Sequence, residues 1–193
     1  MKKKITVILG HPSRESFCSA IMQSYVEGAK EAGAEVKEIY MGDLKFDPTL
    51  WKGYSAIQEL EDDLKKAQED MRWADHLVFI YPTWWGGMPS LMKGFVDRIF
   101  LPGFGFKFHK GKPSPDRLLS GKSARLIVTM DNKQKVSEKL FGAPSVIALK
   151  RIVLEFCGIS PVRTFIVSSL RKFNDEKKNA LLSDIKEMGR KFL

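Results

Sequence analysis

Residues 77–81 read Leu-Val-Phe-Ile-Tyr, and residues 82–89, which follow directly, read Pro-Thr-Trp-Trp-Gly-Gly-Met-Pro. Five consecutive apolar or aromatic side chains are typical of a strand that is buried on both faces of a parallel sheet. The change to proline, threonine and glycine marks the end of the strand and the start of a loop. This stretch therefore predicts a central parallel strand with a loop at its carboxyl end.

Four other short apolar runs accompany this one, at residues 5–9, 36–40, 126–129 and 162–167. Segments with helical spacing lie between and after them, at residues 20–32, 60–73, 89–99, 146–156 and 176–192. Alternation of strand and helix predicts a doubly wound α/β fold with a five-stranded parallel sheet and right-handed crossovers. We expect one domain over residues 1–193. Residues 101–122, rich in glycine and proline, are predicted to form a long functional loop.

The composition is that of an ordinary globular protein, with 44% hydrophobic and 28% charged residues. The net charge of +9 is high, but no helix-turn-helix, RRM or zinc-finger pattern accompanies it, so we do not expect a nucleic-acid partner. A positive field around a pocket for a phosphate-rich dinucleotide explains the charge equally well.

No apolar run approaches the roughly 18 residues of a membrane-spanning helix, so we expect no membrane insertion. The basic residues 1–4 lead into a strand that is too short for the apolar region of a signal peptide, which favours a cytoplasmic protein. Cys18 and Cys157 form no CxxC pair and are expected to be buried free thiols. The three histidines have no zinc-site spacing, so no metal is predicted.

Ligands of open α/β sheets bind beyond the carboxyl ends of the strands, which directs attention to three loops. The first, residues 10–19, contains His11, Arg14 and several serines and opens the first helix. Hydroxyls, cations and the free N–H groups of a helix start favour an anion site. The alternative is an ordinary helix start capped by Ser16 or Ser19.

The second loop places Trp84 and Trp85 next to each other between proline and glycine residues. Two adjacent indoles cannot both point into one core, and a flat aromatic ligand against this loop explains the composition. The alternative is a pair of tryptophans packed under a neighbouring loop or at a subunit interface. The third loop, residues 129–135, is polar and lies where the other edge of such a ligand would fall; alternatively, it is a solvated turn.

These segments resemble the NAD(P)H dehydrogenase (quinone) flavoproteins, including their bacterial and modulator-of-drug-activity members. The matching pieces are His11, Ser16-Phe17, Gln68, and residues 79–86, 88–89, 93–100, 103–106 and 156–158. The resemblance implies a flavodoxin-like fold with strand order 2-1-3-4-5, a homodimer and a tightly held flavin. It also implies ping-pong hydride transfer from NAD(P)H through the flavin to a quinone or similar small electron acceptor.

The resemblance implies roles by position and assigns no catalytic side chain. The residues that would hold the flavin pyrophosphate are His11, Ser16, Phe17 and Cys18, helped by the amide of Gln68. Those that would line the ring are Pro82, Thr83, Trp84 and Trp85, and those that would approach its pyrimidine edge are Thr129, Met130 and Asp131. The substrate pocket would comprise Trp84, Trp85, Phe106 and Phe108, with the two phenylalanines closing the pocket of the partner subunit. The Gln68 match and the resemblance to FAD-binding members favour FAD, with FMN as the alternative.

The sequence departs from the animal members of that family in the third loop. Residues 129–162 contain neither tyrosine nor histidine, so charge stabilisation of a reduced flavin must come from elsewhere. Lys133 is a candidate, because a cation near the ring favours the anionic reduced form; the alternative is a solvated surface lysine. Phe106 and Phe108 offer no hydroxyl to a quinone oxygen, and His109 is expected to face water.

Two other functions are compatible with the same pattern. One is an electron-carrier flavodoxin, although flavodoxins are usually acidic and this chain is basic. The other is a flavin-binding regulatory subunit of a potassium-efflux system.

Overall fold

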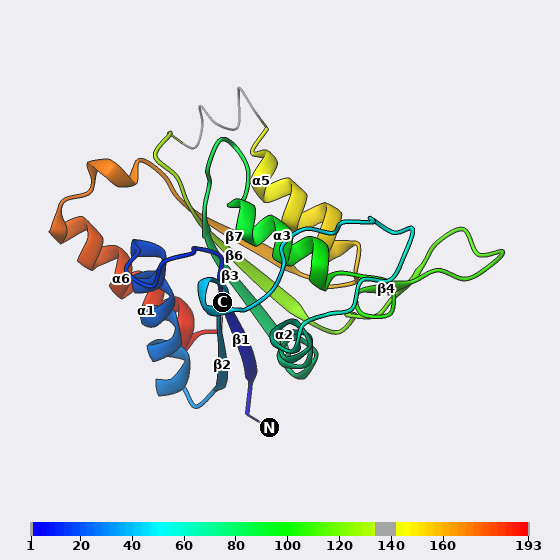
Figure 1. Ribbon diagram of the computed structural model, residues 1–193. Coiled ribbons are helices and arrows are strands. Elements are labelled where there is room, and N and C mark those ends of the chain that lie inside the picture. The colour runs from blue at the N-terminus through cyan, green and yellow to red at the C-terminus, as the bar shows by residue number, and fades with distance from the viewer. Residues whose placement is uncertain (1, 134–141, 193) are drawn as a thin grey trace.

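The computed structural model describes residues 2–133 and 142–192, and its centre is a five-stranded parallel sheet (Figure 1). The strand order is β2-β1-β3-β6-β7, which is the predicted order 2-1-3-4-5 once a separate two-stranded pair is set aside. The strands are β1 (Lys4–Leu9), β2 (Glu35–Tyr40), β3 (His76–Pro82), β6 (Ser123–Thr129) and β7 (Val162–Val167). The prediction of the fold class is thus confirmed.

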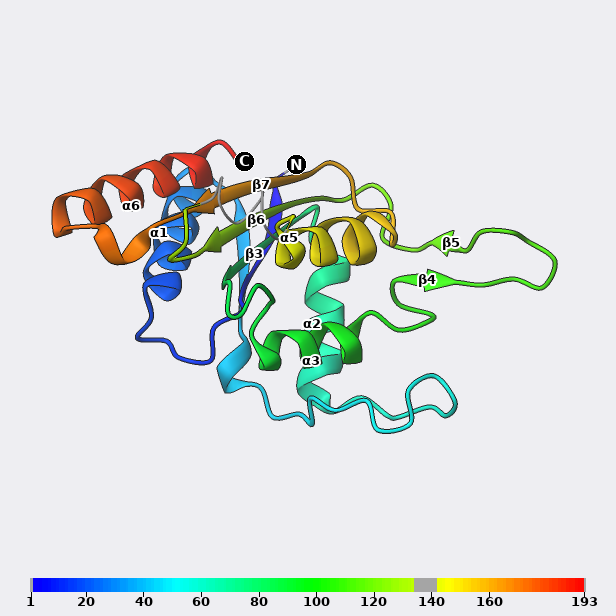
Figure 2. The ribbon, with the colours of Figure 1, turned by 90° about the horizontal axis from the view of Figure 1, so that it is seen from above.

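Helices cover both faces of the sheet (Figures 1 and 2). One face carries α1 (Phe17–Glu31) and α6 (Asp175–Arg190). The other carries α2 (Asp62–Trp73), α3 (Ser90–Ile99) and α5 (Pro144–Ile147), which continues as a π-helical segment over Ala148–Glu155. Two single 3₁₀ turns, Met41–Asp43 and Leu170–Lys172, follow β2 and β7.

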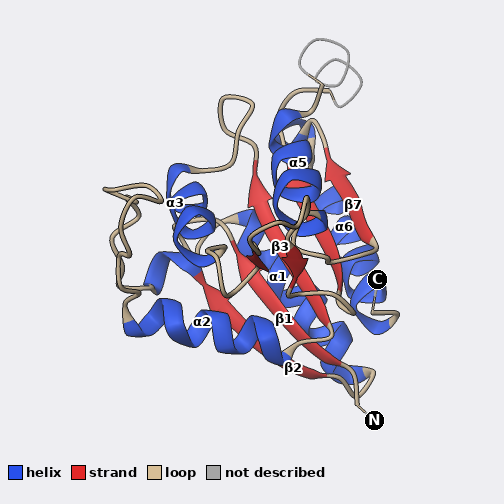
Figure 3. Cartoon of the chain, turned by 90° about the vertical axis from the view of Figure 1, so that its right-hand side faces the viewer, coloured by secondary structure: helices blue, strands red, loops and turns tan. Residues whose placement is uncertain are grey.

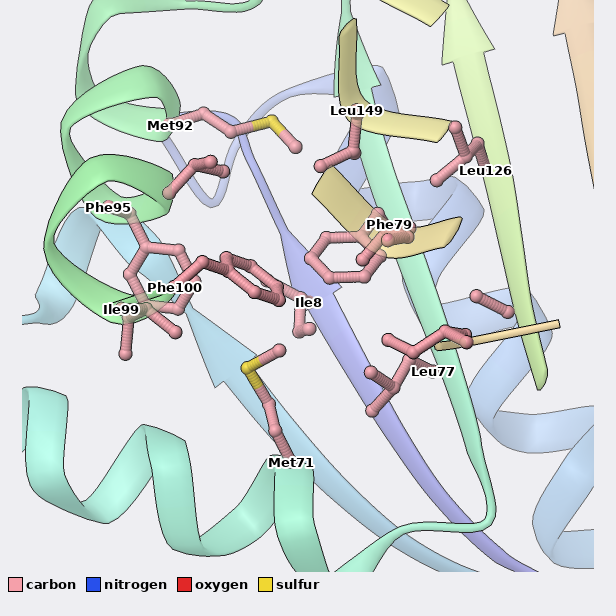
Figure 4. Packing of buried hydrophobic residues seen from close by; sticks show 14 of the residues in the cluster. Ile8, Met71, Leu77, Phe79, Met92, Phe95, Ile99, Phe100, Leu126 and Leu149 are labelled. Carbon is pink, nitrogen blue, oxygen red and sulfur yellow. The ribbon is translucent and has the colours of Figure 1, made fainter. Parts of the chain in front are cut away.

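The two helical layers bury two apolar clusters against the central strand. All seven residues of β3 are buried, and their side chains alternate between the faces. Phe79 and Tyr81 pack towards α2 and α3, whereas Val78 and Ile80 pack towards α1 and α6. Figure 4 shows the first cluster, in which Phe95 and Ile99 of α3 lie over the sheet. A strand buried on both faces explains the continuous apolar run in the sequence.

Three elements differ in detail from their predictions. Helix α1 begins three residues earlier than expected, because the Ser16 side chain accepts a hydrogen bond from the Ser19 N–H and caps the helix. The helix predicted over residues 146–156 has a wide π-helical turn through most of its length. Residues 101–122 are more than a loop, since β4 (Phe106–Lys107) and β5 (Asp116–Arg117) pair antiparallel in a projecting arm (Figure 2).

Close backbone contacts fix the first loop at the carboxyl end of the sheet. The Gly10 N–H donates to the Ile80 carbonyl over 2.8 Å, and a Cβ at Gly10 would lie 2.5 Å from the sulfur of Met92. A Cβ at Gly42 would lie 2.0 Å from the Pro12 carbonyl oxygen. Both positions require glycine, so the loop after β1 is held close to β3 and α3.

Across residues 2–133 and 142–192, no helix combines the length and the apolar character needed to cross a membrane.

Candidate functional site

A cleft of about 180 Å³ opens where the carboxyl ends of β1, β3 and β6 meet. In Figure 3 the strand arrowheads point to this upper end of the sheet. The residues that line the cleft are His11, Ser16, Phe17, Cys18, Pro82, Thr83, Trp84, Thr129, Met130, Asp131 and Leu170. The fold therefore brings together all the predicted flavin-site residues except Gln68 and Trp85.

The first loop and the start of α1 form one wall of the cleft. Ser16 caps the helix, and its hydroxyl also donates to the Ser13 carbonyl over 2.9 Å. Within the described part of the chain, the N–H groups of Phe17 and Cys18 have no hydrogen-bond acceptor. Free N–H groups at a helix start, where the helix dipole is positive, suit a phosphate group.

His11 stands at the mouth of this wall. Its Nδ1 lies 3.0 Å from the Ser13 nitrogen and 3.1 Å from the Ser13 carbonyl oxygen, so the Ser13 backbone fixes the orientation of the ring. The imidazole also packs edge-on against the Trp84 indole, with ring centroids 5.6 Å apart. His11 thus positions Trp84 at the cleft.

The second loop is a two-residue hairpin. The N–H and carbonyl groups of Trp84 and Gly87 bond each other over 3.0 and 2.9 Å, and Trp85 and Gly86 form the turn with φ values of +51° and +76°. Positive φ at both central residues is the pattern of a type I′ turn. Trp84 faces the cleft and is 45% exposed, whereas Trp85 is fully exposed at the tip. The prediction that both indoles line one ligand needs correction, since only Trp84 lines the cleft within one chain.

The third wall is the end of β6. Thr129 is buried, its carbonyl accepts from the Thr83 N–H over 2.8 Å, and its hydroxyl lies 3.4 Å from the Cys18 sulfur. Burial raises the pKa of Cys18 to about 11, so this thiol stays protonated and is not a nucleophile. Asp131 forms an ion pair with Arg171 at 2.7 Å.

Lys133 does not line the cleft. It is exposed, in line with the alternative of a solvated surface lysine. Gln134 and Lys135 lie outside the described residues.

Gln68 does not line the cleft of this chain. It lies on α2, and its buried side-chain amide donates to the Ile99 carbonyl over 2.9 Å. This bond joins α2 to the end of α3, which gives the residue a packing role.

Phe106 and Phe108 lie on another face of the molecule. Phe106 packs against Phe108 and Phe156, with centroid distances of 5.4 and 5.2 Å. Phe106 and Phe156 line an apolar groove of about 410 Å³ between α3 and the π-helical segment. His109 lies on the projecting arm, where it bonds Asp116 over 2.6 Å.

Sequence reasoning missed two residues of the site. Leu170 closes the cleft from the turn after β7, and its N–H donates to the Met130 carbonyl over 3.3 Å. Ser145 lies behind the cleft, with its hydroxyl 3.1 Å from that of Thr83. Only the position of Leu170 beyond the fifth predicted strand could have pointed to it.

The side chains in the cleft offer binding rather than bond-making chemistry. Within residues 2–133 and 142–192, no group of three or more histidine, cysteine or acidic side chains could hold a metal ion. The cleft combines an aromatic wall, a polar edge and a helix start, which together suit a flat ring with a phosphate tail.

Comparison with known proteins identifies the family of the chain. A family model described as flavodoxin-like fold matches residues 3–191. A ribosyldihydronicotinamide dehydrogenase-like protein of Penicillium crustosum is 29% identical, over 96% of this chain and 80% of its own. An uncharacterised NAD(P)H oxidoreductase of Haemophilus influenzae is 26% identical, over 91% of this chain and 89% of its own.

Solved structures agree on the fold. The NAD(P)H:quinone oxidoreductase of Methanothermobacter marburgensis superposes with a TM-score of 0.84, at 21% identity and full coverage of both chains. A Streptococcus mutans protein superposes with a TM-score of 0.82, at 28% identity, over 99% of this chain and all of its own. The chain therefore belongs to the flavodoxin-like family, among the NAD(P)H oxidoreductases and quinone reductases that its relatives and structural neighbours represent.

Proposed function

We propose that the chain is a flavin-dependent oxidoreductase that passes electrons from NAD(P)H to a quinone or a similar small acceptor. The observation that carries this proposal is the convergence of three loops on one cleft. The free N–H groups of Phe17 and Cys18, the Trp84 indole and the polar end of β6 meet there. The N–H groups suit the phosphate of a flavin, the indole suits its ring, and the polar end of β6 suits the hydrogen-bonding edge of the ring.

The size of the cleft fits partial enclosure of the ring. Its volume of about 180 Å³ is below the roughly 300 Å³ at which pockets that enclose a drug-sized ligand begin. One face of a bound ring would therefore stay open. In a ping-pong reaction the nicotinamide and the acceptor bind one after the other at the same face of the flavin. An open face of the ring leaves room for both.

The roles of the side chains follow from their positions. The helix start would hold phosphate oxygens through the N–H groups of Phe17 and Cys18. Trp84, oriented by His11, would cover the ring from water, and Thr129 and Met130 would contact its polar edge. A bound flavin supplies the redox chemistry, and the protein supplies position, dryness and electrostatics. FAD is the expected form and FMN the alternative.

A homodimer of single-domain subunits is part of this proposal. The groove between α3 and the π-helical segment is apolar, and Ile152, Phe108 and Tyr54 stand exposed at or beside it. Exposed apolar groups that cluster around a groove mark interaction surfaces. A partner subunit seated there would cover them and could bring its own Phe106 and Phe108 towards the open face of the cleft.

Flavin binding to Trp84→Ala tests the placement of the ring. Loss of one aromatic wall should weaken flavin affinity by roughly 5- to 100-fold, since aromatic stacking contributes about 1–3 kcal/mol. The matched control is Trp51→Ala, which removes an exposed indole far along the chain and should leave affinity unchanged. Titration of flavin fluorescence measures both. Unchanged flavin affinity in Trp84→Ala would show that the ring does not bind here.

Steady-state kinetics test the reaction. NAD(P)H oxidation with menadione should be rapid and give parallel double-reciprocal plots. An electron carrier without its own NAD(P)H site would show almost no turnover. Such a result would leave flavin binding intact but refute the assigned reaction.

A further inference from the structure

A second polar cavity, of about 190 Å³, lies at the opposite end of the sheet from the cleft. His76, Ser123 and Arg163 line it, together with Phe192 near the end of α6. His76 is the first residue of β3, and Pro82, which lines the cleft, is the last. Pro82 is six positions after His76, and a strand rises about 3.3 Å per residue, so the two sites lie roughly 20 Å apart along β3. The termini lie at this end of the strands in Figure 3.

Strand register places four polar side chains on one face here. His76 pairs with Ser123 across β3 and β6, and Arg125 pairs with Arg163 across β6 and β7. Residues 123 and 125 are two apart in one strand, so their side chains point to the same face of the sheet. The four side chains therefore lie on one face of three adjacent strands, and those of His76, Ser123 and Arg163 line the cavity.

Two of these side chains are buried and lack partners. His76 is 4% exposed; its Nδ1 bonds the Ser123 hydroxyl over 2.7 Å, whereas its Nε2 has no partner in the described structure. Arg125 is 7% exposed, and its Nε likewise has none. A buried polar group without a hydrogen bond is costly, so each such group calls for an explanation.

Burial lowers the pKa of His76 to about 4, and the positive charges of Lys3, Arg125 and Arg163 lower it further. The neighbouring acidic residue, Asp75, accepts a hydrogen bond from the Lys4 N–H. Tyr25 of α1 is the other titratable group near Arg125, and its buried hydroxyl has no partner among the described residues. None of the ion pairs formed within residues 2–133 and 142–192 involves Arg125 or Arg163.

Arg98 is fully buried and its Nε also lacks a partner, but its other nitrogens are paired. Arg98 donates to the Glu61 carboxylate over 2.9 Å and to the Glu59 carbonyl over 2.8 Å. This fold thus provides a carboxylate where an arginine has a purely structural role. Arg125 and Arg163 have no such carboxylate among the described residues, and Arg163 lines a cavity instead.

We propose that this cavity binds a small, doubly charged oxyanion, namely phosphate or the phosphoryl group of a larger metabolite. The guanidinium group of Arg163 donates to its oxygens, and His76 donates from Nε2 once its imidazole is protonated. Arg125, on the same face of the sheet, adds positive charge beside the cavity without lining it. Arginine forks match tetrahedral oxyanions in shape and charge. The negative charge of a bound anion also offsets the repulsion among Arg125, Arg163 and protonated His76. A higher anion concentration should therefore make the folded protein more stable.

Thermal unfolding of the flavin-loaded protein tests the site, with sodium sulfate as a probe whose charge is constant over the pH range used. Sodium chloride at equal ionic strength is the reference. At 100 times its dissociation constant, sulfate should increase the folded-to-unfolded ratio about 100-fold and raise Tm by roughly 5–10 °C more than chloride does. Phosphate should act like sulfate, and glycerol 3-phosphate separates a free ion from a phosphate ester.

Two variants and a control locate the effect. Arg163→Gln changes an exposed side chain and should fold normally, while it weakens sulfate binding about tenfold or more, since a charged hydrogen bond is lost. Arg125→Gln should weaken sulfate binding less than Arg163→Gln does, because Arg125 does not line the cavity and acts through its charge alone. Lys177→Gln removes one exposed positive charge from α6 and should bind sulfate as the unmodified chain does.

The pH dependence gives a second, local readout. Sulfate should bind more tightly as pH falls from 7 to 5, and nitrogen-15 NMR of the His76 ring should show its pKa rising when sulfate is bound. Equal effects of sulfate and chloride on Tm would overturn the proposal. So would an Arg163→Gln variant that keeps full sulfate affinity, because binding would then lie elsewhere, for example at the start of α1.

Discussion

Replacement of Trp85 by asparagine should make the flavin-free protein more stable. Trp85 occupies the first central position of a two-residue hairpin with φ of +51°, a left-handed conformation that costs an L-residue about 1–2 kcal/mol. Asparagine tolerates that region, and Asn-Gly is the preferred pair in a type I′ turn. Because Trp85 is fully exposed, the change removes no buried apolar area within the chain.

The expected gain is about 1 kcal/mol, which corresponds to a rise in Tm of roughly 2–4 °C for a chain of this length. Thermal unfolding by circular dichroism, at several protein concentrations, measures it. Trp51→Asn is the control, since Trp51 is also exposed but its φ is not positive, and its Tm should not rise. A lower Tm for Trp85→Asn would refute the reasoning. If that loss grew with protein concentration, it would indicate an indole that is covered by a partner subunit.

Three further predictions concern stability. Gly28→Ala should cost about 1–3 kcal/mol and lower Tm by several degrees in a thermal scan, because the new Cβ would lie 2.0 Å from the Lys186 carbonyl oxygen where α1 meets α6. Arg98→Ala should cost about 1–3 kcal/mol in urea unfolding, since it leaves the Glu59 carbonyl and the partly exposed Glu61 carboxylate without their donor; an unchanged stability would contradict the role assigned to this arginine. Stability should fall as pH drops from about 6.5 to about 4, by up to ~3 kcal/mol, because the unfolded chain protonates His76 in that range and the folded chain, with a His76 pKa near 4, does not. Urea unfolding at pH 7 and 5 should show this slope, and His76→Gln should remove it.

Local patterns predicted most of the sheet and the loops that meet at its carboxyl end. A strand buried on both faces has a continuous apolar run, and residues 77–81 are such a run. The rule that ligands bind beyond the carboxyl ends of parallel strands then selected three loops that line one cleft. The short strands β4 and β5 were missed because two residues are too few for an alternating pattern.

Side-chain roles that depend on tertiary contacts could not be predicted in the same way. The Gln68 amide bonds a carbonyl 31 positions away, which no local pattern encodes. Trp84 and Trp85 are neighbours in sequence, and only the geometry of the turn sends one indole to the cleft and the other to solvent. Leu170 is an unremarkable apolar residue until β7 carries it to the cleft.

The visible absorption spectrum of the protein tests the central claim most directly. The protein is incubated with FAD and, separately, with FMN, and unbound flavin is removed by gel filtration. The account predicts that the protein retains the yellow colour of at least one oxidised flavin, that NAD(P)H bleaches it and that a quinone restores it. A protein that remains colourless after both incubations would contradict the account.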